Sequence, residues 1–179
     1  MSKGYKMFMV KENIAQKEKL EKIYKKVALV YGAVPLQMKL LGSIEATYVE
    51  DFLKMAMRVS KHENIPLELF TFIRLHIAYK EEYIYCKKYN TQVLLSKGYT
   101  QEQLDSAIAD ITSIPLSHKE QQLAYYAVKS VYESSTFSQD DFDILYQMGW
   151  SQKDVFDAID HAGTLLKNGR ILNTYLKKD

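Results

Sequence analysis

The chain has 179 residues, enough for one domain with a buried core, and contains only seven glycines and three prolines. Because β-sandwiches and β-barrels need frequent turns, this composition argues against both. The net charge of +2 predicts no attraction to nucleic acid or to a membrane surface, and the single cysteine, Cys86, together with the lack of a signal sequence, predicts a cytoplasmic protein.

The first third of the chain predicts three helices. Apolar residues spaced three and four apart run over residues 13–31, and Gly32 follows where a helix-ending glycine belongs. A short helix is expected over residues 36–41, after a proline. Ser43 is the predicted N-cap of the next helix, which reaches about residue 59.

A long stretch without glycine or proline follows Pro66 and continues to Gly98. Proline is common in the first turn of a helix, so Pro66 predicts a helix start. The polar residues 80–82 replace the apolar stripe for a short distance. We therefore expect the helix to bend or break there.

The second half carries four helix starts of the same kind. A hydroxyl residue is followed three positions later by Gln, Glu or Asp at Thr100, Ser117, Ser138 and Ser151. No alternating strand pattern of useful length occurs. The sequence therefore predicts an all-α fold with seven or eight helices.

A sequence repeat connects two of these starts. Residues 93–101 reappear as residues 144–152, each copy combining a helix end, a glycine, an aromatic residue and a new helix start. This pattern predicts a helical hairpin used twice. The first copy also resembles a helix-turn-helix, but residues 99–112 contain three acidic residues and no Lys or Arg, which argues against DNA binding.

Charge is distributed unevenly along the chain. Residues 1–30 contain eight Lys and three Glu (8 − 3 = +5), whereas residues 134–160 contain one Lys and six Asp (1 − 6 = −5). These segments are either two solvated helix faces or complementary surfaces that meet within the fold or between subunits.

The sequence offers no metal or cofactor motif. The four histidines show no metal-ligand spacing with one another, and each is expected to be an ordinary surface or interface residue. No glycine-rich phosphate loop and no Gly-x-Ser-x-Gly motif occurs. We therefore expect no metal and no cofactor.

Cys86 is the remaining candidate for a chemical centre. If residues 81–90 are helical, Glu82, Tyr83 and Asn90 lie on the same face as Cys86. On that face, Glu82 would either oppose ionisation of the thiol or accept its proton.

Two lysines follow the cysteine directly. Lys87 and Lys88 would favour the thiolate if their side chains fold back toward it. The alternative is a buried thiol that packs as a small apolar side chain.

The order and spacing of several segments resemble the AhpD-like fold, also called the carboxymuconolactone decarboxylase family. The resemblance covers about residues 24–175 and rests on Tyr31–Pro35, Ile65–Pro66, the Cys86 segment, Lys97–Thr100, Leu123–Lys129, Phe137–Asp141 and Gly149–Val155. It implies a single AhpD-like helical domain over residues 1–179, with residues 1–13 as a loose extension. It also implies peroxidase-like antioxidant chemistry and assembly into a homo-oligomer.

Peroxide-reducing members of this family carry Glu-x11-Cys-x-x-Cys-x3-His, in which the cysteines form a redox disulfide and Glu and His relay protons. On this chain the four positions fall on Thr71, Tyr83, Cys86 and Asn90. A tyrosine cannot form a disulfide and an asparagine does not titrate near neutral pH, so the dithiol relay is incomplete. We take Cys86, Glu82, Tyr83 and Asn90 as the candidate catalytic residues.

Three interpretations follow. In the first, Cys86 alone performs thiol-dependent redox chemistry and an external thiol reductant replaces the missing cysteine. In the second, the same site binds a small ligand or performs decarboxylase-like chemistry without redox change. In the third, the protein is a catalytically inactive, oligomeric interaction protein. The sequence does not predict the small-molecule substrate.

Overall fold

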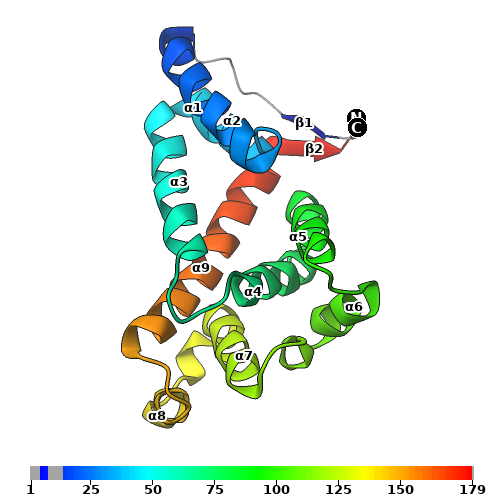
Figure 1. Cartoon of the computed structure of the whole chain (residues 1–179), viewed down its shortest axis with the longest axis vertical. Coiled ribbons are helices and arrows are strands. Elements are labelled where there is room, and N and C mark those ends of the chain that lie inside the picture. The colour runs from blue at the N-terminus through cyan, green and yellow to red at the C-terminus, as the bar shows by residue number, and fades with distance from the viewer. Residues whose placement is uncertain (1–4, 8–13, 179) are drawn as a thin grey trace. The chain divides into compact units, whose positions relative to one another are not determined.

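The computed structural model describes residues 5–7 and 14–178 (Figure 1). Within these residues it contains nine α-helices, three short 3-10 helices and two three-residue strands. The chain divides into two compact units, Met1–Lys61 with Ile171–Asp179 and His62–Arg170. The all-α fold class is confirmed.

The first unit contains three helices and a strand pair. The helices are α1 (Lys17–Tyr31), α2 (Leu36–Ile44) and α3 (Ala46–Ser60), preceded by the 3-10 helix η1 (Ile14–Gln16). Strand β1 (Tyr5–Met7) pairs antiparallel with β2 (Leu176–Lys178). The core of this unit contains Leu20, Val27, Met38, Ala46 and Val49. Apart from β1, the expected N-terminal extension lies outside the described residues.

The second unit surrounds one buried helix. Its elements are α4 (Leu67–Lys80), α5 (Ile84–Ser96), α6 (Gln101–Ala109), η2 (Ile111–Ser113), α7 (His118–Tyr132), η3 (Ser134–Thr136), α8 (Gln139–Gln147) and residues 152–170 of α9 (Gln152–Tyr175). Helix α4 packs against α5, α6 and α7 (Figure 1). Eight of its residues are buried, as expected for a helix that is apolar on nearly every side.

The break expected near residues 80–82 is present. Helix α4 ends at Lys80 and α5 begins at Ile84. Between them Glu82 has φ +56°, a left-handed conformation that few residues other than glycine adopt. The break divides the long apolar stretch into two helices, so the described chain has one helix more than the upper expectation of eight.

The predicted N-cap at Ser43 is wrong. Helix α2 continues through this residue to Ile44, and α3 begins after Glu45, whose backbone is extended. The Ser43 hydroxyl donates a hydrogen bond to the Leu40 carbonyl oxygen. A serine inside a helix can make this bond to the preceding turn, so its presence does not identify a helix start.

The repeated hairpin is confirmed. Gly98 follows α5 with φ +93°, and Gly149 follows α8 with φ +83°, so each glycine ends its helix in the left-handed region. The next residue closes both turns in the same way: the Tyr99 amide donates to the Leu94 carbonyl, and the Trp150 amide donates to the Leu145 carbonyl.

Helix capping gives a first stability prediction. At the start of α7, Ser117 Oγ accepts a hydrogen bond from the Glu120 amide, and the Glu120 carboxylate accepts one from the Ser117 amide. Ser117→Ala removes one of these bonds and should lower the free energy of unfolding by about 1 kcal/mol. Urea denaturation measures this. Ser106→Ala, at an exposed position inside α6, is the control and should change little; equal losses would contradict the capping role.

Within the described residues, no helix combines the length and apolar character needed to cross a membrane.

Candidate functional site

Cys86 lies in the first turn of α5 and is only 7% exposed. Burial raises the pKa of its thiol to about 11, although the positive charge of Arg74 acts in the opposite direction. With that pKa, only about one thiol in several thousand is ionised near pH 7.5. The resting site therefore holds a protonated, shielded cysteine.

A guanidinium lies at the centre of the polar contacts around this cysteine. Arg74 of α4 donates from Nε to Asn90 Oδ1 of α5 (2.9 Å) and from Nη2 to Thr71 Oγ1 one turn earlier (2.7 Å). Its Nη1 is 3.2 Å from His161 Nε2 of α9. Because a guanidinium can only donate, His161 Nε2 accepts, and the neutral imidazole carries its proton on Nδ1.

Two of the three residues that accept from Arg74, Asn90 and Thr71, are themselves held by further hydrogen bonds. Asn90 is 2% exposed, and its Nδ2 donates to the Cys86 carbonyl oxygen at 2.8 Å. Thr71 is 1% exposed, and its hydroxyl donates to the Leu67 carbonyl at 2.8 Å. Asn90 therefore connects the guanidinium to the backbone of Cys86.

Tyr83 is buried immediately before α5. Its hydroxyl lies 3.1 Å from the Leu166 carbonyl oxygen and 3.4 Å from Glu81 Oε2. Its ring lies directly against Gly169 of α9, where a Cβ would overlap it. Burial, with a smaller effect from Glu81, raises the pKa of Tyr83. Tyr83 thus fills space and anchors the turn to α9.

Glu82 lies apart from this network. Its side chain is 78% exposed, and its carboxylate forms an ion pair with Lys87. The expected common helical face of Glu82 and Cys86 is wrong, because α5 begins only at Ile84. Lys87 lies beside Glu82 and 4.9 Å from the centre of the Tyr79 ring.

The comparisons with known proteins concern the fold. No protein-family model and no curated protein matches the chain. Among solved structures, a peroxidase-related protein from Silicibacter sp. TM1040 matches with a TM-score of 0.83 at 13% identity, covering 97% of this chain and 91% of that one. An alkylhydroperoxidase AhpD core protein, described as peroxidase-related, from Ralstonia eutropha JMP134 matches with a TM-score of 0.78 at 15% identity, covering 97% and 90%.

A third solved structure is a cysteine-to-alanine variant of the debrominase Bmp8 in complex with 2,3,4-tribromopyrrole. It matches with a TM-score of 0.70 at 16% identity, covering 92% of this chain and 89% of that one. The chain has the AhpD-like fold. Identities this low establish the fold and leave the reaction open.

Within this AhpD-like fold, the two positions that the sequence resemblance assigns to the proton relay both contact Arg74. Thr71 and Asn90, at the positions of the family's Glu and His, both accept hydrogen bonds from Arg74. Sequence reasoning missed Arg74 and treated His161 as an ordinary surface or interface residue, whereas His161 is buried with 6% exposure. A signal for Arg74 was present, because it is the one residue carrying a permanent charge between Leu69 and Tyr79.

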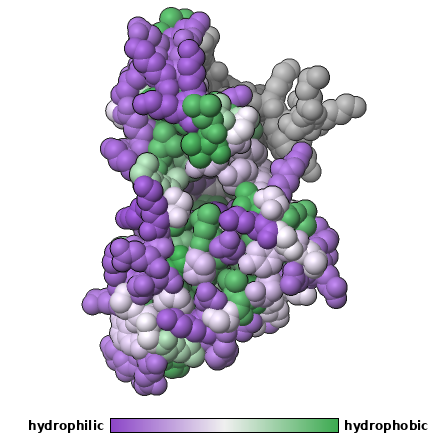
Figure 2. Space-filling model, in the orientation of Figure 1, coloured by the Kyte–Doolittle hydropathy of each residue, from purple (hydrophilic) through white to green (hydrophobic). Residues whose placement is uncertain are grey.

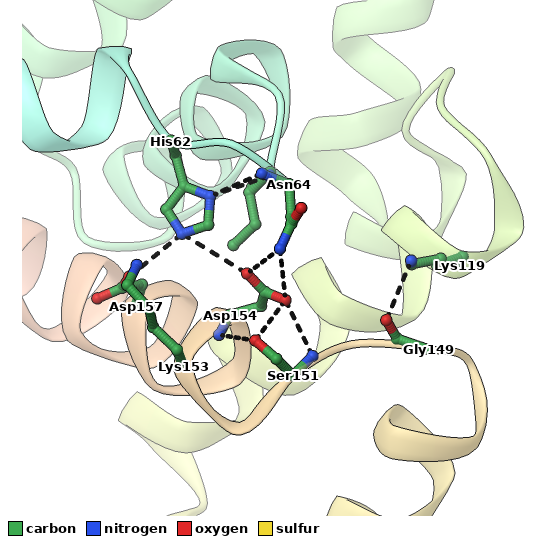
Figure 3. Close-up of polar contacts among 9 residues, drawn as sticks. His62, Asn64, Lys119, Gly149, Ser151, Lys153, Asp154 and Asp157 are labelled. Carbon is green, nitrogen blue, oxygen red and sulfur yellow. Dashed lines mark hydrogen bonds and ion pairs between the residues drawn. The ribbon is translucent and has the colours of Figure 1, made fainter.

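A second polar cluster joins the segment before α4 to the start of α9 (Figure 3). His62, whose side chain is 4% exposed, accepts hydrogen bonds at Nδ1 from the Asn64 and Ile65 amides, so its proton is on Nε2. Nε2 lies 3.2 Å from Asp157 Oδ2 and 3.8 Å from Asp154 Oδ1. Of the expected surface or interface position, the surface part is wrong for His62, because its side chain is buried.

Asp154 connects this cluster to the first turn of α9. Its Oδ2 accepts from the Ser151 amide (2.9 Å) and hydroxyl (2.7 Å), and both carboxylate oxygens face Asn64 Nδ2. Burial opposes ionisation, but the bonds from Ser151 and Asn64 and the nearby His62 outweigh it and lower the pKa of Asp154. Across the described residues, no group of three or more His, Cys, Asp or Glu side chains could hold a metal ion. The hydrogen bonds of the cluster connect the segment before α4 to the first turn of α9.

Proposed function

We propose that the protein belongs to the AhpD-like family, with a degenerate Cys-x-x-Cys motif, and that it reduces a small organic hydroperoxide through Cys86 alone. The observation that carries the proposal is the guanidinium of Arg74, which Asn90 connects to the backbone of Cys86. Its charge opposes the rise in the pKa of Cys86 that burial causes. The AhpD-like fold, whose similar structures include two peroxidase-related proteins, supports it.

The proposed reaction has an oxidative and a reductive half. The Cys86 thiolate attacks one oxygen of the hydroperoxide; an S–O bond forms, the O–O bond breaks, and the leaving alkoxide takes a proton to become an alcohol. Cys86 becomes a sulfenic acid. One external thiol then condenses with it, giving a mixed disulfide and water. A second external thiol attacks that disulfide, leaves as an external disulfide and restores the Cys86 thiol.

Each candidate residue has a different role in the proposed reaction. Cys86 is the nucleophile, Asn90 positions Arg74, and Tyr83 closes the site at the position where the family has its first cysteine. Glu82 remains a candidate proton acceptor, and it would act from the exposed side of the turn. An external thiol is required because the chain has one cysteine.

Sulfenic acid trapping tests the proposal. The folded protein is treated with tert-butyl hydroperoxide and dimedone, and the adduct at Cys86 is measured by mass spectrometry. Because the pKa of Cys86 is raised to about 11, the thiolate fraction and the labelling rate should both rise about tenfold per pH unit between pH 7 and 9. Cys86→Ser is the blank. Absence of the adduct in folded protein, with labelling of urea-unfolded protein, would rule the proposal out.

The burial of Cys86 favours a second candidate function. A thiol that is 7% exposed behaves as a small apolar side chain, which suits a non-redox protein that binds a small ligand, performs decarboxylase-like chemistry or serves only in interactions. In that case Cys86 stays unlabelled in the folded protein. Cys86→Ala then changes stability without removing any activity toward peroxide.

Self-association is part of the proposal. At the end of α1, Leu29 is 86% exposed and Val30 is 78% exposed, beside the exposed Lys25 and Lys26. Figure 2 shows apolar side chains, in green, among the hydrophilic ones on the face in view. Exposed apolar groups of this kind favour an interface between copies of the chain. Light scattering that finds only a monomer would contradict it.

A further inference from the structure

We propose that Arg74 stabilises the anionic forms of the Cys86 side chain, the thiolate and the sulfenate, and that His161 is the positioning residue that holds Arg74 for this task. The inference rests on the proposed function, in which Cys86 is the nucleophile. It assigns to a fixed positive charge on α4 the electrostatic stabilisation of the Cys86 anion, next to the two positions that the resemblance gives to the family's proton relay.

The guanidinium is fixed by contacts from three helices. Thr71 of α4, Asn90 of α5 and His161 of α9 each contact a different nitrogen of Arg74. Three contacts in different directions leave the planar group little freedom. A charge held in this way needs no rearrangement when an anion forms in the first turn of α5, to which Asn90 connects it. A fixed charge stabilises such an anion more effectively than a mobile side chain does.

Asn90 connects the fixed guanidinium to the backbone of Cys86. One end of its amide accepts from Arg74, and the other end donates to the carbonyl oxygen of Cys86, one helical turn earlier. The guanidinium and the first turn of α5 therefore keep a fixed position relative to each other. The effect of the Arg74 charge on the ionisation of Cys86 is consistent with this placement.

The other charged groups near this turn have different partners. On α5 itself, Lys87 pairs with Glu82, and Lys88 is exposed. From α9, His161 contributes a neutral ring, because its Nε2 accepts from Arg74. Lys87 and Lys88 were thiolate partners only on the condition that they fold back toward Cys86, and in this proposal Arg74 takes that role.

His161 has a testable part in the arrangement. Its ring is 6% exposed and lies against Phe70, with ring centres 4.7 Å apart, so packing fixes the direction of Nε2. Replacing it by leucine removes one acceptor of Arg74 Nη1. Glutamine can restore one, because its amide oxygen accepts hydrogen bonds.

The experiment is the pH dependence of Cys86 alkylation by iodoacetamide in the folded full-length chain. Arg74→Met should slow alkylation at pH 8 about tenfold or more and move the pH profile upward by about one unit. His161→Leu should show a smaller shift in the same direction, and His161→Gln should return the profile toward that of the original protein. Lys88→Met is the matched control and should leave the profile unchanged.

Each of these pH profiles either supports or contradicts the proposed roles of Arg74 and His161. An unchanged pH profile in folded Arg74→Met overturns it, and so does a profile of Lys88→Met that moves as far. If Arg74→Met does not fold, the two His161 variants decide: identical profiles for leucine and glutamine contradict the positioning role. Alkylation reports ionisation and not peroxide reduction. A shifted profile without sulfenic acid formation would therefore reject the proposed function and keep the role of Arg74.

Discussion

Gly169→Ala is expected to destabilise the protein by about 1–3 kcal/mol, the usual cost of forcing an extra methyl group into a filled site. A Cβ at this position of α9 would overlap the ring of Tyr83. That ring is 3% exposed and held by its hydroxyl at the Leu166 carbonyl, so it has little room to retreat. Urea denaturation followed by circular dichroism measures the loss.

The same helix provides the control. A Cβ at Gly163 meets no atom within 4 Å, so Gly163→Ala should be neutral or should stabilise the helix by about 0.5–1 kcal/mol. Tyr83→Leu removes the ring that the new methyl group meets. In the double variant Tyr83→Leu/Gly169→Ala, the second change should therefore cost less than it does alone. An equal cost in both backgrounds would show that Tyr83 does not fill this space.

Asp154→Asn is expected to lower the free energy of unfolding by about 2–3 kcal/mol near pH 7, because charge-assisted hydrogen bonds lose strength when the carboxylate becomes an amide. The carboxylate accepts from the Ser151 amide and hydroxyl and from Asn64 Nδ2. In the folded protein the pKa of Asp154 lies below its ordinary value of 3.8. Its stabilising contribution is therefore complete above that value and is lost as the pH falls through the folded pKa.

The difference between the original chain and Asp154→Asn should thus be full from pH 5 to 7 and shrink as the pH falls below about 4. Denaturation curves at several pH values test this. Asp143→Asn, at an exposed position of α8, is the control and should show little difference at any pH. A deficit in Asp154→Asn that stays constant down to pH 2 would contradict the assigned pKa direction.

Local signals in the sequence predicted most of the helices correctly. The N-cap residues of α6 and α7, Thr100 and Ser117, form the predicted capping boxes, because hydroxyl and Gln or Glu side chains three residues apart satisfy each other's backbone amides. Gly98 and Gly149 end their helices as expected, because a positive φ favours glycine. Such signals depend on residues within one turn of each other.

The candidate site was predictable only in part. Cys86 and Asn90 lie together because they are one turn apart on α5, whereas Glu82 is lost from that face through the break before Ile84. Arg74 and His161 are 87 residues apart in the chain and meet only through the packing of α4 against α9. Neither periodicity nor spacing encodes that contact, so a single sequence could not place His161 in the site.

The burial of α4 also constrains how the chain can be made. During synthesis Leu67–Lys80 leaves the ribosome before α5, α6 and α7, the helices that later pack against it. Until those segments follow, the eight residues that end up buried are open to water and to other chains. A chain truncated after Lys80 would therefore expose an apolar helix without the helices that cover it in the complete fold.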